Sequence, residues 1–310
     1  MSIIEQAAKR LEELRRAGVE VPISVASVPV QAAARAVSQE SAVEATPRRQ
    51  TEATAPTARS EDAAGRRSRS VVINLGRLTA MGYVTPDTPR TQLAEEFRVI
   101  KRPLLSNAVG RSAAPVTRGN LIMVTSAMPG EGKTFTAVNL AMSIAMELDH
   151  TVLLVDADVA RPAVLERLGL PATRGLLDLL TEPQIELADV LLRTNVEKLS
   201  ILPAGAPHDR ATELLSSDGM RRLLDELAGR YPDRIIVFDA PPLLASTESR
   251  ALATQMGQVV VVVEAERTPQ SAVEQALATI ENCPVVMTLL NKVAASDVGS
   301  YYGYYRAVSA

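Results

Sequence analysis

The 310-residue chain is short of several features, and each shortage narrows what the protein can be. Its single cysteine, Cys283, cannot form an internal disulfide, which suits a reducing cytosol. No apolar run is long enough to cross a bilayer, and the first residues lack the apolar core of a signal peptide. A net charge of −3 provides no electrostatic reason to expect nucleic acid or anionic lipid as a partner. We therefore expect a cytoplasmic protein that binds no nucleic acid, and any association with the inner face of the plasma membrane must come through a partner.

The first 70 residues differ in character from the rest. Apolar residues recur at helical spacing from Ile3 to Leu14, and Gly18 ends the pattern, which predicts an amphipathic helix over residues 1–18. This helix has no core of its own, so docking on a partner and folding back onto the main domain are equally open. Residues 19–70 are rich in Ala, Ser, Thr, Pro and charge without sustained periodicity, which predicts a disordered linker.

A phosphate-binding loop is predicted where an apolar run over residues 121–127 breaks into Met128-Pro-Gly-Glu-Gly-Lys-Thr134 and a helical pattern follows. Backbone N–H groups of such a loop wrap the phosphates of ATP, and the helix N-terminus adds positive potential. Lys133 would reach the β- and γ-phosphates, and the Thr134 hydroxyl would hold Mg²⁺. The usual signature begins with glycine where this chain has Ala127, a small departure. The residues expected to contact the nucleotide are Pro129, Gly130, Glu131, Gly132, Lys133, Thr134 and Phe135.

Acidic residues follow two further apolar runs. Residues 152–155 lead into Asp156 and Asp158, and residues 235–238 lead into Asp239. Each of these acids stands at or just past the carboxyl end of a buried parallel strand, where open α/β sheets bind ligands. A lone acid at such a place can merely cap the next helix. Three acids at two strand ends, downstream of a phosphate-binding loop, instead favour a site for ATP and Mg²⁺.

The remaining pattern alternates strands with helices, which predicts an α/β fold: a P-loop NTPase with a mainly parallel sheet and helices on both faces. Hydrophobic residues make up 46% of the chain, enough to build such a core. Strands are expected near residues 121–126, 152–156, 198–202, 234–239, 258–263 and 285–290. Helices are expected over residues 133–147, 163–168, 175–180, 211–229, 246–254 and 269–282. Asn291, just past the last strand, is expected to reach the adenine on position alone.

Tyrosines are concentrated at the end of the chain. Aromatic residues make up only 3% of the sequence, yet four of the six tyrosines fall within the last ten residues: Tyr301, Tyr302, Tyr304 and Tyr305. Packing does not readily explain such clustering in a terminal tail, although an aromatic tail docked on the domain remains an alternative. The functional interpretation is a cluster of autophosphorylation sites.

Taken together, the loop, the Asp-x-Asp and Asp-Ala-Pro-Pro strand ends and the tyrosine tail resemble the bacterial tyrosine kinases, a branch of the P-loop ATPases unrelated to eukaryotic protein kinases. The resemblance covers about residues 71–310. Residues 78–87 and 95–105 further resemble the exosortase-associated tyrosine autokinases, a subgroup found beside exopolysaccharide genes. The domains that the resemblance implies are a family-specific arm with an oligomerisation helix over 71–118, a kinase domain over 119–295 and a tyrosine-rich tail over 296–310.

The resemblance also implies roles for single residues in an ATP-dependent protein-tyrosine autokinase. Asp156 would accept the proton of the tyrosine hydroxyl. The metal ligands would be Thr134, Asp158 and Asp239, and the catalytic residues would be Lys133, Asp156 and Asp158. In the family pattern an Arg stands at the position of Ala160, whereas here Arg161 lies one residue later, so its role is open.

Subunits of this family pack into a ring through a Glu-x-x-Arg-x-x-Arg helix. Glu95 and Arg98 match that motif, whereas Lys101 replaces the last Arg and would lose bidentate pairing. We therefore expect a homo-oligomer, with a ring as one form. The alternative is a solvated helix with pairing between Glu95 and Arg98 of the same chain.

The partner implied by the resemblance is a membrane chain-length-determinant protein that activates the kinase, with a cognate tyrosine phosphatase opposing it. The implied role is control of exopolysaccharide polymerisation or export. Two alternatives are a partitioning or cell-division ATPase switch, which would carry a lysine in place of Met128, and a nucleotide-gated scaffold without kinase activity. Only about ten residues separate Asn291 from Tyr301. To reach Asp156 of the same chain, the tail would have to reverse its direction tightly. Phosphorylation in trans is therefore predicted.

Overall fold

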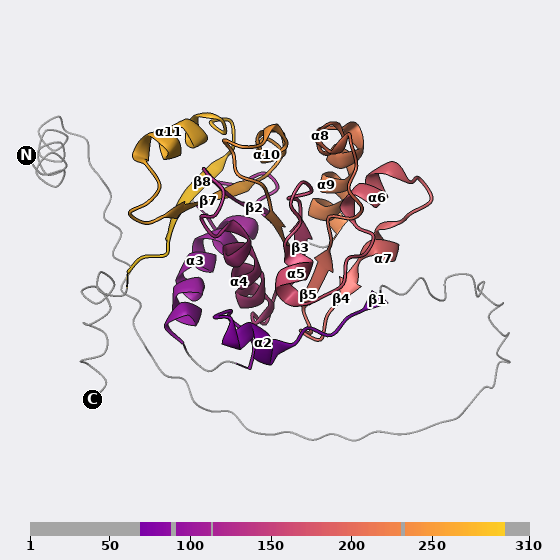
Figure 1. The fold of residues 1–310 in the computed structure, drawn as a ribbon, viewed down its shortest axis with the longest axis horizontal. Helices are drawn as coiled ribbons and strands as arrows, with labels where there is room; N and C mark the ends of the chain where they lie inside the picture. The colour runs from indigo at the N-terminus through magenta and orange to yellow at the C-terminus, as the bar shows by residue number, and fades with distance from the viewer. Residues whose placement is uncertain (1–68, 88–90, 113, 231–232, 295–310) are drawn as a thin grey trace, which may run out of the picture. The chain divides into compact units, whose positions relative to one another are not determined.

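A mainly parallel sheet organises the residues that the computed structural model describes, which are 69–87, 91–112, 114–230 and 233–294 (Figure 1). In this part of the chain the sheet has eight strands in the order β1-β4-β5-β3-β6-β2-β7-β8. Only the β4–β5 pair of these strands is antiparallel. The strands are β1 (Arg69–Ser70), β2 (Leu121–Ser126), β3 (Thr151–Asp156), β4 (Leu192–Arg193), β5 (Leu199–Leu202), β6 (Arg234–Asp239), β7 (Gln258–Glu264) and β8 (Val285–Asn291).

Helices cover both faces of this sheet. One face is packed by α2 (Leu75–Ala80), α3 (Gln92–Ala108), α4 (Lys133–Ala145) and α5 (Val164–Leu168). The other face is packed by α6 (Leu176–Thr181), α7 (Leu187–Val190), α8 (Ala211–Leu215), α9 (Asp218–Arg230), α10 (Thr247–Ala253) and α11 (Gln270–Ala278). Figure 1 shows α3 and α4 together on one side and α8 and α9 on the other.

Alternation along the strands builds two hydrophobic cores. On β2, Leu121 and Met123 face one core, whereas Ile122 and Val124 face the other, and all four are fully buried. Successive side chains of a strand point to opposite faces, so a strand covered on both sides is apolar throughout. This arrangement confirms the predicted α/β fold with a mainly parallel sheet.

Some local predictions were wrong in detail. The helix expected over residues 211–229 is two helices, because the Ser217 hydroxyl donates to the Leu214 carbonyl (2.7 Å) and accepts from the Met220 N–H (3.2 Å) between them. Arg69–Ser70, expected at the end of the linker, instead pairs with β4. The short elements α7 and β4 were not predicted, since so few residues carry no measurable periodicity. The helix expected over residues 1–18 and the tail over 296–310 lie outside the described residues, as does nearly all of the linker.

The segment after β1 is tied to α4, and this positions it beside the phosphate-binding loop. Asn139 of α4 accepts a hydrogen bond from the Val84 N–H (2.7 Å) and donates one to the Phe135 carbonyl (2.9 Å). The ring centroids of Tyr83 and Phe135 are 5.0 Å apart. Residues 81–84 therefore form part of the wall around the start of α4.

Candidate functional site

The phosphate-binding loop joins the end of β2 to the start of α4. Gly130 and Gly132 have φ angles of 89° and 97°, in the left-handed region that residues with a Cβ rarely adopt. A Cβ on Gly132 would also lie 2.1 Å from Nδ2 of Asn291, so the Asn291 side chain would have to move to admit any other residue there. Lys133 and Thr134 are the first two residues of α4, at the positive end of its dipole.

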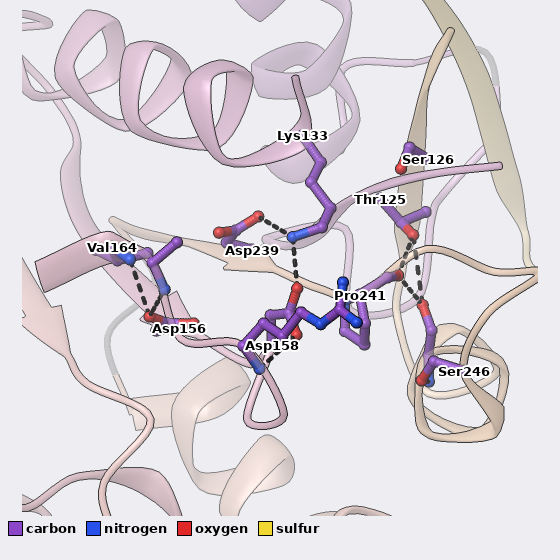
Figure 2. Close-up of polar contacts among 12 residues, drawn as sticks. Thr125, Ser126, Lys133, Asp156, Asp158, Val164, Asp239, Pro241 and Ser246 are labelled. Atoms are coloured by element: carbon purple, nitrogen blue, oxygen red, sulfur yellow. Dashed lines mark hydrogen bonds and ion pairs between the residues drawn. The ribbon is translucent and has the colours of Figure 1, made fainter. Parts of the chain in front are cut away.

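Lys133 contacts two of the predicted acids (Figure 2). Its Nζ lies 2.6 Å from Oδ2 of Asp158 and 3.9 Å from Oδ1 of Asp239. The acids meet because β3 and β6 are parallel neighbours with Asp156 opposite Asp239 in register. The structure therefore places Lys133 and all three acids in one cluster at the carboxyl edge of the sheet.

Asp239 is the most buried member of this cluster, with no exposed surface. Burial raises its pKa to about 6, against the opposing effects of the Lys133 charge and of the nearby Thr134 hydroxyl. Neither carboxylate oxygen has a hydrogen-bond partner of good geometry among the described residues. Burying an ionised carboxylate without hydrogen-bond donors is costly, and a cation bound beside Lys133 would offset that cost.

This donor set fits Mg²⁺ brought in with a nucleotide. No group of three Asp, Glu, His or Cys side chains in the described ranges encloses a metal by itself. Mg²⁺ at phosphate sites keeps several waters and takes only one or two protein oxygens besides the phosphates. The unpartnered oxygens of Asp239, the buried Asp158 and the Thr134 hydroxyl at the helix start supply such a partial set.

The two carboxylate oxygens of Asp156 differ in their hydrogen bonding. Its Oδ2 accepts hydrogen bonds from the Ala163 N–H (3.1 Å) and the Val164 N–H (3.0 Å), at the start of α5. Its Oδ1 is buried and has no hydrogen-bond partner within the described residues. Burial, reinforced by the charge of Asp239, raises the pKa of Asp156 to about 7. Capping of α5 thus uses one oxygen, and the other accepts no hydrogen bond from the described residues.

Asp156 also lines a largely apolar cavity. This cavity measures about 360 Å³, and Pro162, Leu165 and Pro203 are among its lining residues together with Asp156. Largely apolar walls that include a carboxylate are suited to a side chain that has an aromatic ring and a single hydroxyl.

Arg161 belongs to a second cavity on the other side of the cluster. Its backbone N–H donates to Oδ1 of Asp158 (3.2 Å), which holds that carboxylate towards Lys133. The cavity measures about 370 Å³ and is lined by Arg161, Lys133, Asp158 and residues of the Pro241–Pro242 loop. Through its backbone, Arg161 therefore helps to orient the Asp158 carboxylate.

A larger cavity of about 640 Å³ lies beside the start of α4. Its walls include the predicted residues Gly130, Gly132, Lys133, Thr134, Phe135 and Asn291. Four further lining residues were not predicted: Met81, Tyr83, Arg167 and Lys292. Their approach depends on long-range packing, so no local pattern could have identified them, although Met81 and Tyr83 lie in a segment that carried the family resemblance. The volume suits a nucleoside next to the loop.

Two predicted nucleotide contacts have another partner in this structure. The Asn291 amide donates to the Glu131 carbonyl (2.8 Å), on the loop rather than in the open cavity. The Glu131 side chain is 2% exposed, and its Oε2 accepts from the Met128 N–H (2.5 Å). Only the backbone of Glu131 is thus free to face a phosphate. Pro129 lines the cavity that contains Arg161.

The three residues of the predicted oligomerisation motif have different surroundings. Glu95 and Arg98 form an ion pair with each other on the exposed side of α3. Lys101 is 5% exposed, and its Nζ donates to the Ser143 carbonyl (2.6 Å) and pairs with Glu147 (2.5 Å). The expectation that Lys101 contacts a neighbouring subunit therefore does not fit its position, since it joins α3 to the end of α4 within one chain.

Comparison with known proteins finds a matching family, similar sequences and a similar solved structure. The AAA domain family matches residues 119–292. The chain is 30% identical over 234 residues to the tyrosine-protein kinase YwqD of Bacillus subtilis, covering 75% of this chain and 94% of that protein. It is also 30% identical over 226 residues to the succinoglycan biosynthesis transport protein ExoP of Rhizobium meliloti, covering 71% of this chain but only 28% of that longer protein. The crystal structure of the chimerical protein CapA2B2 superposes with a TM-score of 0.56 at 27% identity, covering 72% of this chain and 93% of that one.

Proposed function

The chain belongs to the family of bacterial tyrosine-protein kinases, and we propose that it transfers the γ-phosphoryl group of ATP to tyrosines of its own C-terminal tail. The observation that carries this proposal is the cluster in which Lys133 and Asp158 are paired, with Asp156 and Asp239 on adjacent strands beside them. Phosphoryl transfer needs charge neutralisation, alignment and a group that accepts a proton from the attacking hydroxyl. The cluster contains a candidate for each task.

Nucleotide binding falls to the loop and to Lys133. With ATP bound, the Lys133 ammonium would exchange part of its contact with Asp158 for phosphate oxygens, which carry more charge. Mg²⁺, when bound, would neutralise charge on the transferred group, and Thr134, Asp158 and Asp239 would hold it. The cavity of about 640 Å³ beside Phe135 would receive the nucleoside.

Asp156 would accept the tyrosine proton. A free tyrosine hydroxyl has a pKa near 10, so a base whose own pKa lies near neutrality is well matched to assist it. Support comes from the pKa of about 7, the unpartnered Oδ1 and the apolar cavity lined by Pro162, Leu165 and Pro203. In this arrangement the capping bonds at Oδ2 fix the direction in which Oδ1 points.

The acceptors would be Tyr301, Tyr302, Tyr304 and Tyr305, which lie outside the described residues. Replacing all four with Phe should abolish most phosphotyrosine and leave nucleotide binding intact. Mass spectrometry after incubation with Mg-ATP tests this directly. Full labelling of the variant at other sites would exclude the tail as the principal acceptor.

We propose that the tail of one subunit enters the site of another. The tail leaves from the end of β8, which is four strands from β3 in the sheet, roughly 19 Å away at the usual strand spacing. The ten residues from Asn291 to Tyr301 can span at most about 35 Å, so length alone permits either route. The exposed Glu95–Arg98 pair is the proposed contact between subunits.

A mixing experiment decides between the two routes. A Lys133→Met chain supplies acceptors without activity, and a chain that ends at residue 295 supplies activity without acceptors. Phosphotyrosine on the Lys133→Met chain is expected only in the mixture. Failure of the mixture, under conditions where wild type labels well, would favour transfer within one chain.

The biological role follows from the family. We propose that phosphorylation regulates exopolysaccharide polymerisation or export, together with a membrane chain-length-determinant protein and a tyrosine phosphatase. In the described ranges no helix is long and apolar enough to span a membrane. Each phosphate would add close to two negative charges, and repulsion among clustered phosphates would favour release of the tail from a neighbour.

A nucleotide switch or scaffold without kinase activity is the second candidate. A partitioning ATPase would need a lysine at the start of the loop, where Met128 is found with 42% of its surface exposed. Absence of phosphotyrosine in the mass spectrometry, together with clear hydrolysis of ATP, would favour this alternative.

A further inference from the structure

The carboxylate of Glu131 stabilises the phosphate-binding loop through hydrogen bonds. Besides the Met128 N–H, this carboxylate accepts a hydrogen bond from the Thr268 hydroxyl through Oε1. The Glu264 N–H lies 3.4 Å from the same oxygen and 3.2 Å from the Thr268 hydroxyl. Glu131 therefore links the start of the loop to the segment between β7 and α11.

The carbonyl groups of the loop are held in the same way by the end of β8. Lys292 Nζ donates to the Gly130 carbonyl (2.8 Å), and Asn291 Nδ2 donates to the next carbonyl, that of Glu131 (2.8 Å). Lys292 is kept in place by an ion pair with Glu264 (3.0 Å). Two adjacent residues at the end of β8 thus hold two consecutive carbonyl groups of the loop.

Two residues within or next to these contacts have unusual backbone conformations. Glu266 and Lys292 have φ angles of 59° and 58°, in the left-handed region. Non-glycine residues adopt it at a cost of order 1 kcal/mol or more, and such residues gather where the surrounding structure constrains a functional site. Glu266 follows Glu264 by two residues, just after β7, and Lys292 forms the ion pair with Glu264.

We propose that Thr268 and Lys292 are positioning residues for the polyphosphate of a nucleoside di- or triphosphate. Thr268 acts through the Glu131 carboxylate and Lys292 through the Gly130 carbonyl. This assignment rests on the nucleotide binding in the proposed function. A peptide group points its N–H opposite to its C=O, so holding the two carbonyls outward turns the following N–H groups towards the phosphates. Because the Glu131 carboxylate bonds to Met128 and Thr268, it stabilises the loop and does not bind the nucleotide.

Matched substitutions test this assignment by binding. Thr268→Val keeps the shape of the side chain and removes its hydroxyl, and it should weaken Mg-ADP binding about tenfold, the effect of losing one hydrogen bond to a charged group. Thr268→Ser should restore affinity to near wild type. Thr279→Val removes a hydroxyl that bonds only the Ala276 carbonyl within the turn after α11, and it should leave affinity unchanged.

A second pair examines Lys292 independently. Lys292→Met keeps the length of the side chain without the ammonium and should also weaken Mg-ADP binding about tenfold. Lys198→Met is its control, since Lys198 donates to the Glu147 and Leu148 carbonyls (both 2.6 Å) away from the loop. Fluorescent ADP titration gives the affinities, and melting of the ligand-free proteins gives their stabilities.

The kinetic readout separates positioning from general loss of structure. Thr268→Val should raise KM for ATP about tenfold and change kcat by less than about twofold, because the loop is used to bind the phosphates. A lowered melting temperature with unchanged Mg-ADP affinity and KM would overturn the assignment. Absence of Mg-ADP binding in wild type would overturn the proposed function and this assignment together, whereas equal binding by wild type and Thr268→Val would overturn the assignment alone.

Discussion

Replacing Asp239 with Asn should stabilise the ligand-free protein and abolish its response to magnesium nucleotide. Asp239 has no exposed surface, and burial raises its pKa from 3.8 to about 6. A difference of about two pH units between the folded and unfolded pKa corresponds to about 3 kcal/mol, at roughly 1.4 kcal/mol for each unit. The folded protein therefore bears about 3 kcal/mol of unfavourable free energy when this carboxylate is ionised.

The sign of the pH dependence follows from proton binding. Between about pH 4 and pH 6 the folded state keeps a proton on Asp239 that the unfolded state has lost. Wild-type stability therefore falls as the pH rises through this window and stays lower above it. Asn does not titrate, so Asp239→Asn should match wild type near pH 4 and exceed it by up to about 3 kcal/mol at pH 8.

Urea unfolding at pH 4.5, 6 and 8 in the presence of EDTA measures this difference. Asp209→Asn is the control, because Asp209 is an exposed residue before α8 and its replacement should change stability by less than about 0.5 kcal/mol at each pH. Adding Mg-ADP should stabilise wild type and leave Asp239→Asn nearly unchanged. The reasoning would be refuted by a variant less stable than wild type at pH 8, or by a difference that does not vary with pH.

Four further predictions concern other residues of the site and of α3. Asp156→Asn should keep ATP binding and lower the single-turnover rate on the order of 10²–10⁴-fold, and an unchanged rate would remove Asp156 from its role as base. Gly132→Ala should abolish Mg-ADP binding, because its φ of 97° and the 2.1 Å approach of Asn291 exclude a Cβ; titration showing wild-type affinity would contradict this. Lys101→Met should lower the free energy of unfolding by about 1–3 kcal/mol, since the buried Ser143 carbonyl loses its donor. Arg98→Ala, at the exposed pair, should change it by less than about 0.5 kcal/mol but shift the protein towards monomer in ultracentrifugation, and an unchanged oligomer would count against the proposed contact.

Local patterns were enough to predict the centre of the site. The loop could be read from Gly132-Lys133-Thr134 between a strand and a helix, and Asp156 and Asp239 from their places at the ends of apolar runs. These predictions needed no knowledge of strand order, because the carboxyl ends of parallel strands meet at one edge of a sheet. The alternation of fully apolar strands with helices likewise predicted the fold class.

The sequence by itself therefore determined the fold class, the loop and the acidic cluster, whereas only the tertiary structure decided what surrounds them. The sequence assigned Lys101 to an oligomerisation motif, whereas the packing of α3 on α4 buries its side chain against the Ser143 carbonyl. Glu131 and Lys292 lie 161 positions apart in the chain, and their joint hold on the loop depends on β8 ending beside it. Contacts between such distant segments follow from strand order and helix packing, which no periodicity within one segment encodes.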